Sequence, residues 1–227
     1  MSGDFAALSR LLQERWTCRA FASTPIPKSD VERLLALAQR TASWCNTQPW
    51  EVIITSVEET ARLREALGAH VMSQPQGSDF EFPTGFPGAY GDRRRECGFQ
   101  LYDSLGIQKS DAEGRLRQML RNFDFFDAPH VALITVEADL GPYALLDTGI
   151  YVSSLLLGAQ ALGLAAAPQA ALAGYAEFFR GHFDLPPTRL VALGIAVGYA
   201  AAGEAVNEFR TSRADLADVV AWQGTWA

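Results

Sequence analysis

Ser43-Trp44-Cys45-Asn46-Thr47-Gln48-Pro49-Trp50 connects an amphipathic run to a short β-branched run at residues 52–55. Such connections are usually made of glycine and small turn residues, whereas this one combines two amides, two indoles and a proline. Because Gln48 precedes a proline, we expect it to be extended. Asn46 and Gln48 offer donors and acceptors that could bind the edge of a planar heterocycle, or could satisfy loose backbone groups of a structural turn. The stretch alone leaves both interpretations open.

The residues upstream of this stretch predict two helices with a cationic segment between them. Apolar residues at helical spacing predict a helix over residues 4–14 and a second one over residues 29–38. Between them, Arg15-Trp16-Thr17-Cys18-Arg19 places two arginines four residues apart with a hydroxyl midway. We expect these side chains to converge on one side of a helix end or tight turn. The two arginines either interact favourably with the dipole at the C-terminal end of the helix or form an anion pocket, since arginine forks bind phosphate in a bidentate manner.

The residues downstream predict a strand over 52–55, a helix over about 57–67, and then a long irregular segment. From Met72 to Tyr90, prolines and glycines are interleaved with aromatic residues. A loop of this length inside a compact domain is usually a lid, a binding loop or disordered, and the aromatic residues favour a packed lid. Arg93-Arg94-Arg95-Glu96 then begins a helix to about residue 105. This charge run is typical of a solvated face, with a surface that attracts an anionic substrate as the alternative.

The second half of the chain contains the most apolar segments. Near-continuous apolar runs at residues 130–136 and 190–198 predict strands buried on both faces. Pro142 begins an apolar helix that ends near Leu162, and its Asp147, Gln160 and glycines make it a poor membrane span. We expect this helix to be buried in a core or against a second subunit. Residues 165–171 carry little side-chain bulk, which allows either a flat ligand against the backbone or tight helix–strand packing.

The composition favours one globular domain over residues 1–227. The chain has 227 residues, 48% of them hydrophobic and 20% charged, which is typical of a folded domain with a substantial core. We find no internal repeat, low-complexity tract or linker. The net charge of −7 argues against a general nucleic-acid binder, because such proteins present a basic surface.

The cysteines and missing motifs exclude several classes of protein. Cys18, Cys45 and Cys97 have no metal-like spacing, and the N-terminus shows no basic region followed by an apolar run. We therefore expect reduced thiols in a cytoplasmic protein. The chain contains no H-x-x-x-H, C-x-x-C or G-x-S-x-G pattern, which argues against a zinc site or a serine hydrolase.

Four segments together resemble the FMN-dependent nitroreductase family: Arg15-x-Thr17-x-Arg19, Asn46-Thr47-Gln48-Pro49-Trp50, Pro168-Gln169-Ala170-Ala171 and Asn207-x-Phe209-Arg210-x-x-Arg213. Each segment is weak alone, but together they span nearly the whole chain in the order of the family. The resemblance implies an α+β fold with a mixed central sheet flanked by helices. It also implies an intertwined homodimer with FMN at the subunit interface.

The resemblance assigns expected cofactor contacts residue by residue. The phosphate and ribityl chain of FMN would contact Arg15, Thr17, Arg210 and Arg213, with the share of the last two left open. Arg19 would lie beside the pyrimidine edge of the flavin. The ring or ribityl chain would also contact Asn46 and Gln48, and one ring face would be covered by Pro168, Gln169 and Ala170.

Three departures from the family limit what transfers. Many relatives have serine where this chain has Thr17, but the hydroxyl is kept. One branch carries a Pro-Ile-Glu-Gly type segment where this chain has Pro168-Gln169-Ala170-Ala171, so an acidic group that could tune the ring is absent. The aromatic loop from about Phe80 to Tyr90 resembles a branch-specific insertion that shapes the substrate pocket.

The activity implied by the resemblance is NAD(P)H-dependent reduction of nitroaromatics, quinones or similar small acceptors. The family uses a ping-pong scheme with hydride transfer to flavin N5, which requires no separate nicotinamide domain. Consistent with that scheme, the chain has no G-x-G-x-x-G and no Walker pattern. Arg19 would stabilise the reduced ring, and we assign no side chain as nucleophile, general acid or base.

Three alternatives remain open. One is a specialised reductase of the same family acting on halogenated aromatics or enones. Another is a flavin-binding module that stores or senses FMN without turnover. The last is a scaffold without cofactor whose motif positions are structural. The acceptor, the choice between NADH and NADPH, and the number of electrons transferred are not fixed by the sequence.

Overall fold

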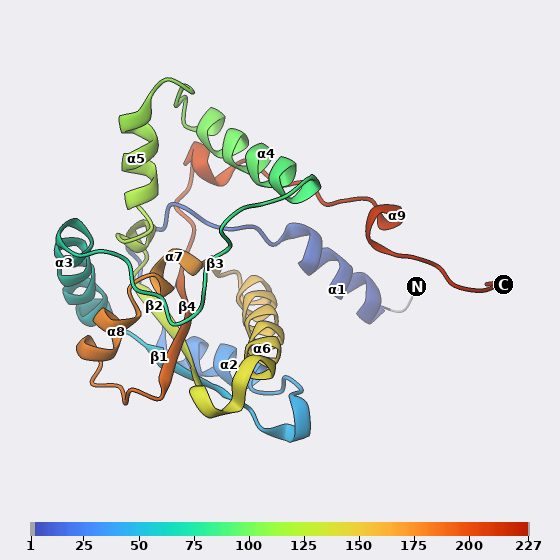
Figure 1. Cartoon of the computed structure of the whole chain (residues 1–227), viewed down its shortest axis with the longest axis horizontal. Helices are drawn as coiled ribbons and strands as arrows, with labels where there is room; N and C mark the ends of the chain where they lie inside the picture. Colours follow the sequence, from blue (N-terminus) through green and yellow to red (C-terminus); the bar gives the residue numbers. More distant parts are fainter. Residues whose placement is uncertain (1–2, 227) are drawn as a thin grey trace.

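The computed structural model describes residues 3–226 and consists of one sheet between two layers of helices, with a third group of helices at one end (Figure 1). The helices and strands are α1 (Gly3–Glu14), α2 (Lys28–Ala38), β1 (Trp50–Ile54), α3 (Val57–Ser73), α4 (Ala89–Ser104), α5 (Ala112–Leu120), β2 (His130–Glu137), α6 (Gly141–Ala161), β3 (Ala165–Gln169), α7 (Ala170–Ala173), α8 (Ala176–His182), β4 (Arg189–Gly198) and α9 (Leu216–Val219). Short 3-10 turns lie between several of them.

The sheet differs in one respect from the mixed sheet that the sequence led us to expect. Its strands lie in the order β1-β2-β4-β3, and all three pairings are antiparallel. Among residues 3–226, parallel pairing is limited to isolated bridges, Thr17 with Ala166 and Gly77 with Tyr175. The segment beside β3 at Thr17 forms a single bridge, so within this chain it does not extend the sheet by a parallel strand.

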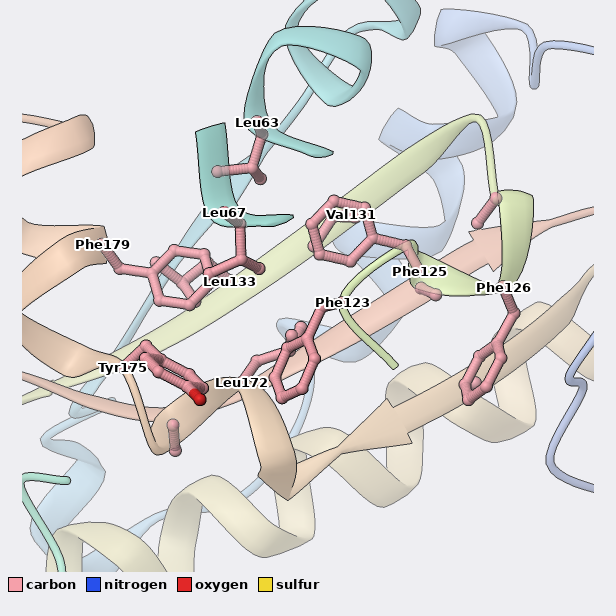
Figure 2. Close-up of a cluster of buried hydrophobic side chains, with 14 of the residues drawn as sticks. Leu63, Leu67, Phe123, Phe125, Phe126, Val131, Leu133, Leu172, Tyr175 and Phe179 are labelled. Carbon is pink, nitrogen blue, oxygen red and sulfur yellow. The ribbon is translucent and has the colours of Figure 1, made fainter. Parts of the chain in front are cut away.

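The alternation of side chains along β2 explains why both faces of the sheet are buried. Successive residues of a strand point to opposite faces, and here Val131 and Leu133 join one apolar cluster while Ala132 and Ile134 join the other. The first cluster packs against α3, α7 and α8 through Leu63, Leu67, Leu172 and Phe179 (Figure 2). The second packs against α2 and α6 through Leu34, Ala38, Tyr151 and Leu155. The near-continuous apolar run at residues 130–136 is therefore a strand buried on both faces, as predicted.

The long apolar helix predicted after Pro142 is α6, which has this proline in its first turn. It packs against α1, α2 and the three strands β1, β2 and β3. A Cβ added at Gly158 would lie 2.9 Å from Leu34 Cδ1, so this glycine lets α2 approach closely. Among the described residues, Ala138–Ala161 is long and apolar enough to cross a membrane by length and composition. Its contacts with the sheet and with α2 are those of a core helix.

Three residues of the connection before β1, including Gln48, have a left-handed backbone conformation. The expectation that Gln48 is extended was therefore wrong. Cys45, Asn46 and Gln48 have φ values of 50°, 57° and 48°. Two side chains stabilise this turn, since Gln48 N donates to Ser43 Oγ at 2.9 Å and Trp44 N donates to Asp147 Oδ2 at 3.0 Å. These bonds oppose the strain of a left-handed non-glycine residue, which is of order 1–3 kcal/mol.

The irregular segment expected from Met72 to Tyr90 is shorter, because α3 continues to Ser73 and α4 begins at Ala89. Its first part is fixed to the body of the protein. Asp79 accepts hydrogen bonds from Arg180 Nη1 at 2.7 and 2.6 Å and from Val191 N at 2.7 Å. The segment is thus an anchored loop at its start.

Candidate functional site

Five of the predicted site residues line one cavity of about 750 Å³. They are Arg15, Thr17, Arg19, Arg210 and Arg213. The cavity lies between the segment that follows α1, the middle of α6, Cys97 of α4, and the segment that follows the 3-10 turn Ala205–Asn207. The structure therefore brings the first and the last predicted segments together at one place.

The segment with Arg15, Thr17 and Arg19 begins at the end of α1, as expected, because Arg15 follows Glu14 and its N donates to Leu11 O at 3.0 Å. It runs beside β3, with a parallel bridge between Thr17 and Ala166 and a 3.1 Å hydrogen bond from Cys18 N to Ala166 O. Alternate residues of a chain in β geometry share one side. The spacing of two residues therefore directs the two arginines and the hydroxyl into the cavity.

Asn207 joins the C-terminal segment to this first segment. Its side chain is buried, Oδ1 accepts from Arg19 N at 2.9 Å, and Nδ2 donates to Ala20 O at 2.9 Å. These bonds connect parts of the chain that are 188 and 187 residues apart in sequence. Because Asn207 is three residues from Arg210, it fixes where the C-terminal arginines enter the cavity.

The cavity is strongly cationic although the chain as a whole carries a net charge of −7. Between residues 3 and 226, none of its four arginines forms a salt bridge with a carboxylate. Burial lowers the pKa of Arg19, and burial together with the charge of Arg213 lowers the pKa of Arg15. Arginines held close together without counter-ions define a binding site for an anion.

Asn46 and Gln48 do not line this cavity. Gln48 Nε2 donates to Asn46 O and Oδ1 at 3.1 Å, and Gln48 Oε1 accepts from Gln39 Nε2 at 2.8 Å. Within one chain the two amides therefore stabilise their own turn. Both remain exposed, beside the tilted pair formed by Trp44 and Tyr143.

Pro168, Gln169 and Ala170 lie where β3 ends and α7 begins, and they also do not line the cavity. The strand they end is the one that Thr17 contacts through Ala166. Gln169 is buried, and its Nε2 donates to Asn122 O at 2.7 Å. Its Oε1 is buried without a hydrogen-bond partner among the described residues.

Several residues that line the cavity were not predicted from the sequence. Cys97 comes from α4, and Gly149, Val152, Ser153, Leu156 and Leu157 come from α6. The small residues Gly149 and Ser153 are four positions apart, which is a pattern that places them on one helix face. No sequence pattern indicated Cys97, because its position depends on how α4 packs near the C-terminal segment.

The chain belongs to the nitroreductase family, whose family model matches residues 12–199. It is 33% identical over 213 residues to nitroreductase NfnB of Mycolicibacterium smegmatis, covering 93% of this chain and 91% of that protein. It is 30% identical over 215 residues to a 4-nitrobenzoate reductase of Pseudomonas putida, covering 94% and 92%. The crystal structure of FMN-dependent NfnB from Mycobacterium smegmatis in complex with NADPH superposes with a TM-score of 0.92, at 32% identity and with 97% and 99% coverage.

These similarities confirm the family inferred from the four segments and the α+β class of the fold. The match covers all the elements of the sheet and most of the cavity wall. The C-terminal arginines lie beyond the residues that the family model matches. The superposition on NfnB covers nearly the whole length of this chain, 97% of it.

Proposed function

We propose that this protein is an FMN-dependent oxidoreductase that uses NAD(P)H to reduce nitroaromatics, quinones or similar acceptors. The observation that carries this proposal is the cavity with four arginines that lack carboxylate partners among the described residues. It occurs in a chain one-third identical to a nitroreductase over nearly its full length. The names of the relatives, which include 4-nitrobenzoate reductase, support nitroaromatic acceptors.

The residues of the cavity fit the phosphate and ribityl part of FMN. Arg15, Arg210 and Arg213 would neutralise the phosphate, and Thr17 would add a neutral donor. Trp16 also lines the cavity, and the guanidinium carbon of Arg210 lies 4.6 Å from its ring centroid.

Bound FMN supplies the electron-transfer chemistry that no side chain of the protein provides. The task of the protein is to bind, orient and polarise the flavin. Arg19 is the more buried of the two arginines in the first segment, and Asn207 fixes its backbone. A positive charge held rigidly beside the pyrimidine edge would stabilise negative charge that develops there.

A homodimer is the second part of the proposal. α1 has no buried residue and exposes Phe5, Leu8 and Leu12, while the start of α6 exposes Tyr143, Leu146 and Ile150. The C-terminal segment after α9 extends past α1, away from the sheet (Figure 1). Contiguous exposed apolar surfaces mark protein contacts, and a second copy would cover them. Trp44, in the same turn as Asn46 and Gln48, contacts Tyr143 of this surface, so the two amides would then reach the flavin of the partner.

The remaining assignments follow from this proposal. The chain would form a single domain over residues 1–227, act in the cytoplasm, and bind neither nucleic acid nor membrane. The segment expected at about 72–90, of which residues 74–88 lie between α3 and α4, would serve as a substrate lid. It carries Phe80, Phe82 and Phe86 and is anchored by Asp79, and Tyr90 follows in the first turn of α4. Pro168, Gln169 and Ala170 would cover one face of the flavin ring.

The visible spectrum of the purified protein tests the proposal. We expect a yellow protein that bleaches with anaerobic NADPH or NADH and recovers its colour when 4-nitrobenzoate or a quinone is added. A yellow protein that neither donor bleaches would favour flavin storage over turnover. A colourless protein that FMN cannot reconstitute would exclude the cofactor and the activity together.

A further inference from the structure

The two cationic segments of the cavity support each other through reciprocal contacts. The guanidinium carbon of Arg210 lies 4.6 Å from the ring centroid of Trp16, and that of Arg19 lies 5.5 Å from the ring centroid of Phe209. Each segment thus contributes one aromatic ring and one arginine, and each arginine rests on the ring of the other segment. All four residues line the same cavity.

These contacts limit the motion of the Arg19 and Arg210 side chains. An arginine loses considerable rotamer entropy when it is fixed, and a guanidinium stacked on an aromatic face is held before any ligand binds. Arg210 is also oriented by hydrogen bonds from Nη1 to Asn207 O at 2.6 Å and to Phe209 O at 2.9 Å. Arg19 Nη1 contacts Thr17 O at 3.3 Å. The rings therefore act as platforms for the two arginines.

We propose that Trp16 and Phe209 are positioning residues with separate tasks toward the flavin. Trp16 holds Arg210 against the phosphate. Phe209 holds Arg19 beside the ring. The assignment rests on the proposed function, because it divides the cavity between the two ends of FMN.

Each ring acts only through the arginine that rests on it. The indole Nε1 of Trp16 is enclosed by protein atoms, and Trp16 packs against the first apolar cluster. Phe209 has no polar atom on its side chain. Trp16 therefore acts through Arg210, and Phe209 acts through Arg19.

The test compares the affinities of the full-length protein for FMN and for riboflavin, which lacks the phosphate. Trp16→Leu is expected to weaken FMN binding by about five- to thirtyfold, the range for loss of a partly desolvated cation–π contact. Riboflavin affinity should stay within about twofold of the wild-type value. The midpoint potential of the bound flavin should stay at the wild-type value within error. Trp16→Phe keeps a smaller ring under Arg210, so FMN affinity should fall by less than about fivefold.

Phe209→Leu should show the opposite pattern. The ratio of FMN to riboflavin affinity should stay at the wild-type value, while the midpoint potential falls and reduction by NADPH slows, because Arg19 is no longer held beside the ring. The matched control is Phe99→Leu, since Lys109 Nζ lies 4.4 Å from the Phe99 ring centroid outside this cavity. That control removes a cation–π contact and should change neither measurement.

A double-mutant cycle shows whether Trp16 acts through Arg210. In an Arg210→Ala background, Trp16→Leu should reduce FMN affinity much less than it does in the wild type. If Trp16→Leu does not fold, the same cycle with Trp16→Phe keeps the packing and tests the weaker cation–π contact of a phenyl ring. An equal decrease in the affinities for FMN and for riboflavin in the Trp16 variants would show that Trp16 has a merely structural role, and would overturn the inference. Wild-type protein that bound no flavin would instead overturn the proposed function.

Discussion

The backbone N–H of Trp44 donates a 3.0 Å hydrogen bond to Oδ2 of Asp147, a residue of α6 that lies 103 positions further along the chain. Asp147 is only 7% exposed. The bond connects the turn before β1 to the long core helix, and the turn contains three left-handed non-glycine residues. The direction in which Asn46 and Gln48 are presented therefore depends on α6.

Asp147→Ala should reduce stability and loosen this turn. Loss of a hydrogen bond to a charged group, with the N–H left unpaired, costs about 1.5–3 kcal/mol, which urea unfolding followed by circular dichroism would measure. Asp147→Asn keeps an acceptor for Trp44 N and should cost less than half as much. Equal losses in the two variants would mean that the carboxylate acts on something other than the turn.

Arg15 and Arg19 should differ in what they contribute. Arg15→Ala should weaken FMN retention about ten- to a hundredfold, since loss of one charge-assisted contact costs roughly 1.5–3 kcal/mol. Arg19→Ala should retain part of the FMN but slow its reduction by NAD(P)H, measured by anaerobic stopped-flow absorbance. Arg10→Ala, which removes an exposed arginine paired with Glu14, is the matched control. Unchanged reduction in Arg19→Ala would disprove the role assigned to Arg19.

The anchor of the 74–88 segment is a further point that can be tested. Asp79→Ala removes the acceptor of Arg180 and of Val191 N, so the segment should detach while the flavin cavity stays intact. We expect faster proteolytic cleavage in the segment and a raised KM for the acceptor, with FMN affinity unchanged. Glu81→Ala alters an exposed carboxylate in the same segment and should leave both unchanged. Wild-type cleavage rates in Asp79→Ala would show that the anchor lies elsewhere.

The three cysteines should differ in their reaction with a thiol reagent. Burial raises the pKa of Cys18 to about 11, so this thiol should stay protonated and unreactive in the native protein. Cys45 is exposed and should react at once. Cys97 lines the flavin cavity, so saturating FMN should protect it, which mass spectrometry of the labelled protein would show. Labelling of Cys97 at the same rate with and without FMN would place the cofactor elsewhere.

The elements of the fold could be predicted because they depend on local pattern. The alternation that buries β2 on both faces and the apolar circumference of α6 are properties of neighbouring residues, and the structure has these elements close to the predicted bounds. The geometry of Gln48 could not be predicted, because side chains at Ser43 and Asp147 decide it. The preference of a residue before proline for an extended backbone is local, and these two side chains override it at Gln48.

The residues of the candidate site could be found by type but not by arrangement. The motif with Arg15, Thr17 and Arg19 indicated an anion pocket, but its β geometry comes from the bridge to Ala166, which is distant in sequence. Trp16 carried no distinguishing pattern, and Phe209 was noted only as part of the C-terminal segment. The role of either ring could not be predicted, because an aromatic ring under an arginine arises only when the two ends of the chain meet. Asn46 and Gln48 could not be placed relative to the cavity from spacing alone.

The turn that precedes β2 gives a prediction with a defined pH dependence. Arg121 donates to both carboxylate oxygens of Asp127, and this contact lowers the pKa of Asp127. A carboxyl group whose pKa is depressed by folding stabilises the native state above its unfolded pKa of about 3.9, and this contribution disappears as the pH falls through the lower native pKa. The pair matters for the site because Phe126 O, in the same turn, accepts from Phe21 N at 3.1 Å.

Asp127→Asn should therefore destabilise the protein at pH 7, and the loss should shrink as the pH falls below about 3.9 and through the lower native pKa. The side chain of Asp127 is 62% exposed, so solvent screening limits the loss at pH 7 to about 0.5–1 kcal/mol. Asn tolerates the left-handed conformation that Asp127 adopts, with φ of 67°, so the backbone is not strained by the change. Unfolding by urea at several pH values would measure the difference, with Asp103→Asn as a control because Asp103 has no ion pair among the described residues. A loss of the same size at every pH would show that Asp127 acts through packing, because only the charged pair with Arg121 is removed by acid.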